Sequence, residues 1–160
     1  GAPVGVTRID VESALEMQAA TQSALPADIA VLSAAVADWR VDTIAGGKIK
    51  KGPGGPPTLA LIENPDILAG VAAPGPNRPA LVIGFAAETT DLEANARAKL
   101  SRKGCDWILG NDVSDDVFGS DGNAVLLVTA DKTETWPRQS KTAIARAVAA
   151  RIADHFKAPE

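Results

Sequence analysis

Apolar runs of strand length alternate with stretches of helical periodicity along most of the chain. Nearly continuous apolar runs are typical of strands buried on both faces, and they occur at 29–36, 80–85 and 107–109. Between the runs, apolar side chains recur at helical spacing over 12–25 and over 91–103. This alternation predicts βαβ units, and therefore an α/β fold of Rossmann-like, three-layer type, with a mostly parallel sheet and helices on both faces.

The same pattern predicts where several elements begin and end. Pro26 ends the first helix and Gly104 closes the helix at 91–103. We expect Asn64 and Pro65 to open a further helix, as N-cap and first helical residue. Ser140 is expected to cap the last helix, whose apolar stripe is Ile144, Val148 and Ile152. The remaining predicted strands are 4–11, 59–62 and an antiparallel hairpin formed by 124–129 and 134–136 around Asp131 and Lys132.

Residues 37–57 interrupt this pattern because they are rich in Gly, Pro and Lys. Their composition predicts a long loop, and loops of this length in a compact domain usually carry function. We expect a mobile loop at about 40–57. The length of 160 residues predicts a single domain, 1–160, that is long enough to bury a core.

Composition excludes several classes of protein. The net charge of −4 argues against a nucleic-acid partner, because such a partner needs a broad basic field. No apolar run reaches the roughly 20 residues of a membrane span, and no signal-peptide pattern is found, so we expect no membrane association. A single cysteine, Cys105, fits a cytoplasmic location, and one cysteine with one histidine excludes a His/Cys zinc cage within one chain.

Polar residues follow three of the predicted strands. Asp38 follows the run at 29–36, Glu88 and Thr89 follow the run at 80–85, and Asn111 and Asp112 follow the run at 107–109. Ligands of open α/β sheets bind at the carboxyl ends of strands, where these residues are expected to meet. Taken separately, each has a structural interpretation as a strand end, helix cap or turn, and Trp39 and Phe85 are each more often packing residues than partners of a base.

Lys48, Lys50 and Lys51 follow Asp38 within the same loop. An acid that can hold a metal ion and lysines that can hold phosphates suggest a nucleoside triphosphate. An exposed, solvated lysine cluster is the alternative. The usual phosphate motifs are absent: no G-x-G-x-x-G follows a strand, and in the Walker-like stretch ending at Lys48 the first glycine and the final Ser/Thr are replaced by Asp42 and Ile49.

The motifs together resemble phosphopantothenoylcysteine synthetase, the C-terminal half of a bifunctional coenzyme A biosynthesis protein. The resemblance runs over nearly the whole chain, in order and with compatible spacing. It rests on the segments 34–40, 48–51, 64–68, 84–89, 99–106 and 111–112.

The resemblance implies a CTP-dependent acid–amine ligase. CTP activates 4′-phosphopantothenate as an acyl-cytidylate, and the amine of L-cysteine then displaces CMP. It also implies Mg²⁺, a homodimer with the site at the subunit interface, and FMN only where an upstream decarboxylase half is present.

By the same resemblance, Lys48 is the catalytic lysine that contacts the phosphates, and Asp38 lies beside the nucleotide and the metal. The remaining residues assigned to nucleotide binding are Ala34, Ala35, Val36, Ala37, Lys51, Asn64, Asp66, Gly84, Phe85 and Ala86.

One departure separates the chain from the family pattern. Family members begin with a further strand, a Gly-rich turn and an Asn-containing segment, and residues 1–11 match a later strand. The chain therefore resembles the C-terminal two-thirds or so of a synthetase domain, whose sheet would expose an edge or face. The alternative function is a non-catalytic nucleotide-binding fragment or proteolytic core, inactive alone.

Overall fold

The computed structural model describes residues 2–43, 46–50, 55, 58–112 and 122–157. Its main sheet has the strand order β1-β4-β5-β6-β7. β1 pairs with β4 and β4 with β5 in parallel, whereas β5–β6 and β6–β7 are antiparallel, so only β6 runs against the other strands. The strands are β1 (Ile29–Leu32), β4 (Leu81–Glu88), β5 (Trp107–Asp112), β6 (Gly122–Val128) and β7 (Thr133–Ser140).

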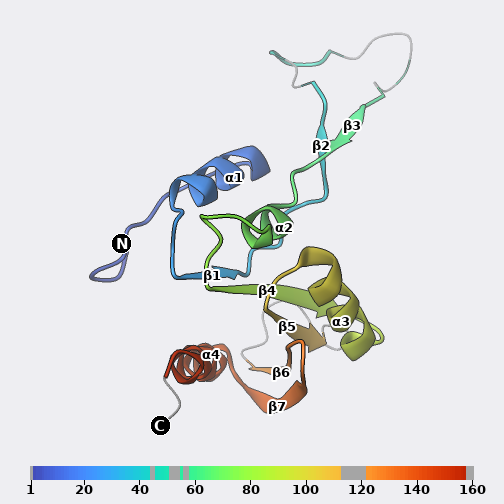
Figure 1. Ribbon diagram of the computed structural model, residues 1–160. Helices are drawn as coiled ribbons and strands as arrows, with labels where there is room; N and C mark the ends of the chain where they lie inside the picture. Colours follow the sequence, from blue (N-terminus) through green and yellow to red (C-terminus); the bar gives the residue numbers. More distant parts are fainter. Residues whose placement is uncertain (1, 44–45, 51–54, 56–57, 113–121, 158–160) are drawn as a thin grey trace.

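Helices cover both faces of this sheet (Figure 1). α1 (Ala14–Ser23), α2 (Ile67–Ala72) and α3 (Leu92–Lys103) lie on one face, and α4 (Lys141–His155) lies on the other. Side chains alternate along β4, so Val82 and Ala86 pack with α2 and α3, whereas Leu81 and Ile83 pack with α4. The predicted three-layer α/β fold is confirmed.

Local sequence signals set several element ends as predicted. Gly104 takes a left-handed conformation, with φ of 66°, and closes α3. The Ser140 hydroxyl accepts a hydrogen bond from the Ala143 N–H at 3.2 Å and caps α4. The predicted hairpin is β6 and β7, whose turn is closed by the Thr129 N–H donating to the Lys132 carbonyl at 2.9 Å.

Other boundaries differ from the predictions. The strand predicted at 4–11 is absent, because these residues pair with no described strand, and residues 4–10 are exposed. The strand predicted at 29–36 ends at Leu32. Asp66, and not Asn64, caps α2: its carboxylate accepts a hydrogen bond from the Ala69 N–H at 3.0 Å.

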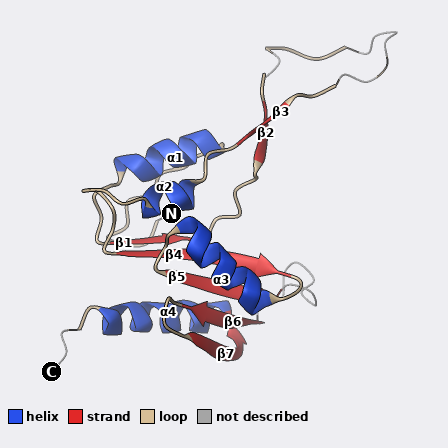
Figure 2. Cartoon of the chain, turned by 45° about the vertical axis from the view of Figure 1, so that its right-hand side comes forward, coloured by secondary structure: helices blue, strands red, loops and turns tan. Residues whose placement is uncertain are grey.

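The predicted loop at 37–57 begins with a strand, β2 (Trp39–Val41), that pairs antiparallel with β3 (Leu61–Glu63). This two-stranded ribbon, with the described residues 42–43, 46–50, 55 and 58–60 between its strands, projects away from the main sheet (Figures 1 and 2). We call it the β2–β3 arm. The strand predicted at 59–62 forms at Leu61–Glu63, outside the main sheet, because it pairs with β2, with Arg40 opposite Ile62. Among the described residues, no helix is long and apolar enough to cross a membrane.

Candidate functional site

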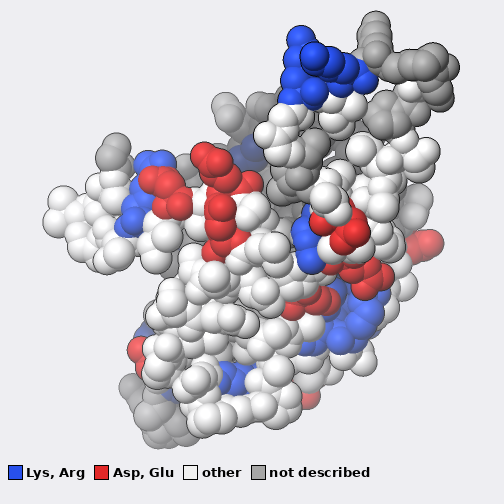
Figure 3. All heavy atoms as spheres, turned by 90° about the horizontal axis from the view of Figure 1, so that it is seen from above, with Lys and Arg blue, Asp and Glu red and all other residues white. Residues whose placement is uncertain are grey.

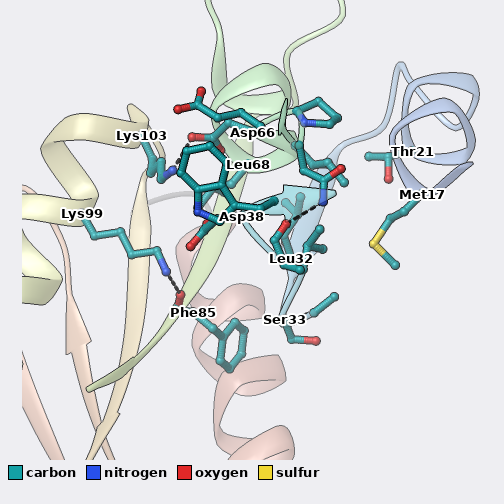
Figure 4. A pocket seen from close by; sticks show the side chains of 18 of the residues that line it. Met17, Thr21, Leu32, Ser33, Asp38, Asp66, Leu68, Phe85, Lys99 and Lys103 are labelled. Atoms are coloured by element: carbon teal, nitrogen blue, oxygen red, sulfur yellow. Dashed lines mark hydrogen bonds and ion pairs between the residues drawn. The ribbon is translucent and has the colours of Figure 1, made fainter. Parts of the chain in front are cut away.

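A cavity of about 650 Å³ opens at the carboxyl end of β1, beside Phe85 of β4, on the face that carries α1, α2 and α3 (Figure 4). We call it the edge cavity. The end of β1 and the chain after it form one wall, and the start of α2 and the last turns of α3 form the others. Its position agrees with the predicted location of ligand sites in open α/β sheets.

Asn64 fixes the wall that follows β1. Its side-chain Nδ2 donates to the Ala37 carbonyl at 2.8 Å, and its backbone N–H donates to the Asp38 carbonyl at 2.8 Å. Arg40 adds a hydrogen bond from its guanidinium to the Glu63 carbonyl. The backbone of 37–38 is therefore held beside the start of α2, although no regular sheet pairing connects the two segments there.

Asp66 serves the edge cavity in two ways. One carboxylate oxygen caps α2, and the other accepts a hydrogen bond from the Lys103 ammonium. Burial raises the pKa of Asp66, but the hydrogen bonds from Lys103 and from the Ala69 N–H, with the charges of Lys103 and Arg102, outweigh burial. The pKa of Asp66 consequently lies below its ordinary value, and the carboxylate is charged at neutral pH.

Lys99 and Lys103 supply the positive charge of the edge cavity. They are four residues apart on α3, so both point to the same side of the helix. The Lys99 ammonium donates to the Phe85 carbonyl at 2.6 Å, while Lys103 pairs with Asp66 (Figure 4). An ammonium group has three donors, so each lysine keeps donors for a bound anion.

Both lysines lie in the motif at 99–106 that contributes to the family resemblance, without a predicted role. Their helical spacing, beside the predicted strand end at Phe85, was the available signal. Two cations on one helix face suit phosphate groups, because a triphosphate carries several negative charges that water would otherwise solvate.

The structure brings together most of the predicted nucleotide-binding residues. Trp39, predicted as packing, is exposed and also lines the edge cavity, as does Phe85. The predicted residues that line the cavity are Ala34, Val36, Ala37, Asp38, Asn64, Asp66 and Phe85.

Ala35, Gly84 and Ala86 do not line the edge cavity. Gly84 instead faces Leu68 of α2: a Cβ placed there would lie 2.6 Å from Leu68 Cδ2. Its lack of a side chain lets a helix pack against the strand. Ala86 is buried in the core between the sheet and α3.

Lys48 lies on the connection between β2 and β3 and is exposed. It does not line the edge cavity, and the arm that carries it projects from the body (Figure 2). Lys51 lies outside the described residues. Seen from above, acidic and basic side chains are intermixed over the body, and a separate basic group lies on the arm (Figure 3).

The other predicted polar groups at the strand ends separate. Glu88 accepts a hydrogen bond from Asn95 Nδ2 of α3 at 3.2 Å. Asn111 lines a second cavity of about 710 Å³ on the α4 face, because its side chain alternates to the same face as Leu109. The two cavities share Val31, Ser33 and Phe85, so they meet at the end of β1 from opposite faces of the sheet.

Asp38 was predicted as a metal ligand, and its side chain is exposed on the wall of the edge cavity. Within the described residues, no group of three or more His, Cys, Asp or Glu side chains is placed to hold a metal ion. A single carboxylate nevertheless fits Mg²⁺, which commonly takes one or two carboxylates and completes its shell with water and phosphate oxygens.

Comparison with known proteins then decides the family. The model of the DNA/pantothenate metabolism flavoprotein C-terminal domain matches residues 1–156. The chain belongs to this family. The coenzyme A biosynthesis bifunctional protein CoaBC of Vibrio cholerae is 47% identical over 150 residues, covering 91% of this chain and 37% of that protein. CoaBC of Mycobacterium tuberculosis is 46% identical over 144 residues, covering 83% of this chain and 34% of that protein.

The crystal structure of the C-terminal domain of a CoaBC protein has the same fold. It superposes with a TM-score of 0.74 at 29% identity, over 95% of this chain and 67% of that chain. The DNA/pantothenate metabolism flavoprotein of Streptococcus pneumoniae shares the fold with a TM-score of 0.62 at 21% identity, over 89% of this chain and 66% of that chain. The resemblance to the C-terminal part of the bifunctional protein is thus confirmed, and the chain spans little more than a third of these curated relatives.

Proposed function

We propose that this chain carries the CTP-dependent ligase chemistry of coenzyme A biosynthesis, joining 4′-phosphopantothenate to L-cysteine. The observation that carries this proposal is the edge cavity, where four of the six segments that resemble the synthetase family meet: 34–40, 64–68, 84–89 and 99–106, the last of which supplies Lys99 and Lys103. The CoaBC name of relatives at 46–47% identity supports the same interpretation.

In this proposal CTP lies with its base against the small residues 34–37 and its phosphates toward Lys99 and Lys103. Small side chains leave backbone groups accessible to the amino-pyrimidine edge. Each ammonium within about 4 Å of a phosphate charge contributes about 4 kcal/mol of attraction at an effective dielectric of roughly 20. The lysine pair thus favours a triphosphate over cytidine or CMP.

Magnesium, when bound, would withdraw charge from the triphosphate and make the α-phosphorus easier to attack. Asp38 is the residue that would hold it, from the wall beside the phosphates. Asp66 is less suited, because both of its carboxylate oxygens already accept hydrogen bonds from Ala69 and Lys103.

The reaction requires two displacements. The carboxylate oxygen of 4′-phosphopantothenate attacks the α-phosphorus of CTP, and the bond to pyrophosphate breaks. The amine of cysteine then attacks the acyl carbon, CMP leaves with the bonding electron pair, and the amine proton passes to water. Neither step needs a protein nucleophile, so catalysis depends on positioning, where effective molarities supply about 7–11 kcal/mol. Lys99 and Lys103 stabilise the negative charge that develops on the phosphates.

Lys48 enters this scheme through a homodimer. It lies on the projecting β2–β3 arm and not in the edge cavity of its own chain. The arm exposes Trp39 and Leu61, with exposed fractions of 55% each, which favours contact with a second copy. In the proposed dimer the site lies at the subunit interface and Lys48 reaches the phosphates there. Sedimentation equilibrium of the chain measures the association.

The second candidate is a non-catalytic nucleotide-binding role. It is favoured by the position of Lys48 outside the edge cavity. Both functions predict CTP binding, and only the ligase predicts turnover.

Pyrophosphate release separates the two functions. We expect release that requires CTP, Mg²⁺ and 4′-phosphopantothenate together, measured for this chain and for the same chain joined to the part of the Vibrio cholerae relative that precedes the matched region. Release from either protein supports the ligase, and Lys48→Gln should reduce it. If both proteins bind CTP but neither releases pyrophosphate, the non-catalytic role is favoured.

A further inference from the structure

A polar cluster centred on Arg78 lies at the amino ends of β4 and β5, where α2 and α3 end. Its guanidinium donates to three carbonyls: from Nε to Ala72 at 2.9 Å, from Nη1 to Pro79 at 2.9 Å and from Nη2 to Gly104 at 3.3 Å. Nη2 also lies 3.0 Å from both carboxylate oxygens of Asp106. Neither Arg78 nor Asp106 lines the cavity.

These bonds join the ends of two helices. Ala72 is the last residue of α2, and Gly104 is the C-cap of α3. A guanidinium charge there satisfies carbonyls that no helical N–H can reach, and it opposes the negative ends of both helix dipoles. Asp106 extends the cluster to the sheet, because its carboxylate accepts a hydrogen bond from the Val82 N–H of β4 at 2.7 Å.

The opposite end of α2 is tied to the same turn of α3. Asp66 caps the start of α2 and pairs with Lys103, and Lys103 immediately precedes Gly104. Arg78 therefore fixes, through Gly104, the backbone from which the Lys103 side chain extends into the edge cavity. Through Ala72 it also fixes the helix that carries the partner of Lys103.

We propose that Arg78 and Asp106 form a positioning pair that holds Lys103 within hydrogen-bonding distance of Asp66 at the edge cavity. Its effect on phosphate binding rests on the proposed function, whereas its effect on the Lys103–Asp66 contact does not. The pair acts through the helix ends and does not touch the ligand.

The test measures the Lys103–Asp66 contact directly. In Arg78→Met, loss of the hydrogen bond and charge of Lys103 should raise the measured pKa of Asp66 toward its ordinary value, followed by NMR of the side-chain carboxyl carbon. Asp106→Asn keeps the size of the side chain at 106 and should also raise the pKa of Asp66. Arg151→Met is the matched control: it breaks the Arg151–Glu134 pair, whose side chains are 29% and 31% exposed, against 23% and 34% for Arg78 and Asp106.

Nucleotide affinity supplies the second measurement. At a temperature where the variants are fully folded, we expect Arg78→Met to weaken the binding of CTP by about 10-fold or more and the binding of CMP by much less. The reason is that the displaced Lys103 ammonium is proposed to contact the phosphates. Arg151→Met should lower the melting temperature and leave both affinities unchanged. A purely structural pair would change melting temperature alone.

An unchanged pKa of Asp66 in folded Arg78→Met and Asp106→Asn would overturn the proposal, whether or not CTP binds. If Arg78→Met fails to fold, Asp106→Asn decides in the same way. If the wild-type chain binds no CTP but the pKa of Asp66 rises in the variants, the positioning pair stands and the proposed function fails.

Discussion

At the scale of single residues, Lys99 and Lys103 are the groups on which nucleotide binding is proposed to depend. Lys103→Met removes a charged donor while keeping an apolar side chain of similar length. A hydrogen bond to a charged group contributes about 1.5–3 kcal/mol, so CTP affinity should fall by about 10- to 150-fold. Isothermal titration calorimetry with CTP and CMP measures the change.

Lys132→Met is the control for this substitution. Lys132 pairs with Glu134 of β7 and does not line the edge cavity. Its loss should leave CTP affinity unchanged. An equal loss of affinity for CTP and CMP in Lys103→Met would show that Lys103 does not bind the β- and γ-phosphates, which CMP lacks.

The lowered pKa of Asp66 predicts a pH dependence of stability. Because the folded-state pKa lies below the ordinary value of 3.8, the stabilisation by charged Asp66 is fully present above that value. It is lost as the pH falls through the lowered pKa. Asp66→Asn retains a good N-cap but loses the charge that pairs with Lys103. The variant should therefore be less stable than wild type at pH 7, and the difference in stability should shrink on acidification. Urea unfolding between pH 7 and pH 3 measures this.

A background that lacks Lys103 provides the control for this prediction. The single variant Lys103→Met is compared with the double variant that combines Lys103→Met and Asp66→Asn. The difference in unfolding free energy between these two proteins should vary less with pH, because the ion pair is absent from both. A difference between wild type and Asp66→Asn that stays constant from pH 7 to pH 3 would contradict the ionic contribution.

The sequence indicated some site residues and missed others for a definable reason. Asp38 was predicted because it follows an apolar strand, whereas Phe85 was predicted only through the resemblance to the synthetase family. Lys99 and Lys103 were missed as functional residues, because a lysine on an amphipathic helix usually faces solvent and only tertiary packing turns this face of α3 toward β4. Sequence proximity also grouped Lys48 with Asp38, although the arm carries Lys48 away from the edge cavity.

At the scale of elements, the packing of α2 on β4 depends on Gly84. A Cβ there would lie 2.6 Å from Leu68 Cδ2 and 2.9 Å from Ile108 Cδ1. We expect Gly84→Ala to lower the free energy of unfolding by about 1–3 kcal/mol through overpacking, and Leu68→Ala in the same protein to recover part of the loss. Chemical denaturation measures both changes.

Gly70 provides a matched control within α2. A Cβ at Gly70 meets nothing within 4 Å, so Gly70→Ala should stabilise the protein by about 0.4–1 kcal/mol. A stabilising Gly84→Ala would contradict the close approach of α2 to β4.

Elements with strong local signals were predicted well, and those that depend on distant partners were not. α3 and α4 have clear periodicity and capping residues, Gly104 and Ser140, and they form where expected. Residues 4–10 have strand-like composition but form no strand, since a strand needs a neighbour to pair with. β2 was missed because its pairing with β3 lies across an insertion rich in Gly and Pro.

At the scale of the whole molecule, the sheet places the proposed site at its carboxyl edge. The two cavities approach the end of β1 from opposite faces and meet at Val31, Ser33 and Phe85. Arg78 and Asp106 lie at the amino ends of β4 and β5, and the arm with Lys48 projects from the body. One chain therefore holds the cavity proposed for the nucleotide and the arm proposed to contact a second copy.

The most direct test is an amide NMR titration of the chain with CTP and Mg²⁺. We predict that the perturbed signals cluster at 34–38, at 64–68, at Phe85 and in the last turns of α3, and that CMP leaves the signals near Lys99 and Lys103 largely unchanged. Perturbations confined to α4 and the cavity around Asn111 and Asn123, with none around the edge cavity, would contradict the proposed nucleotide site.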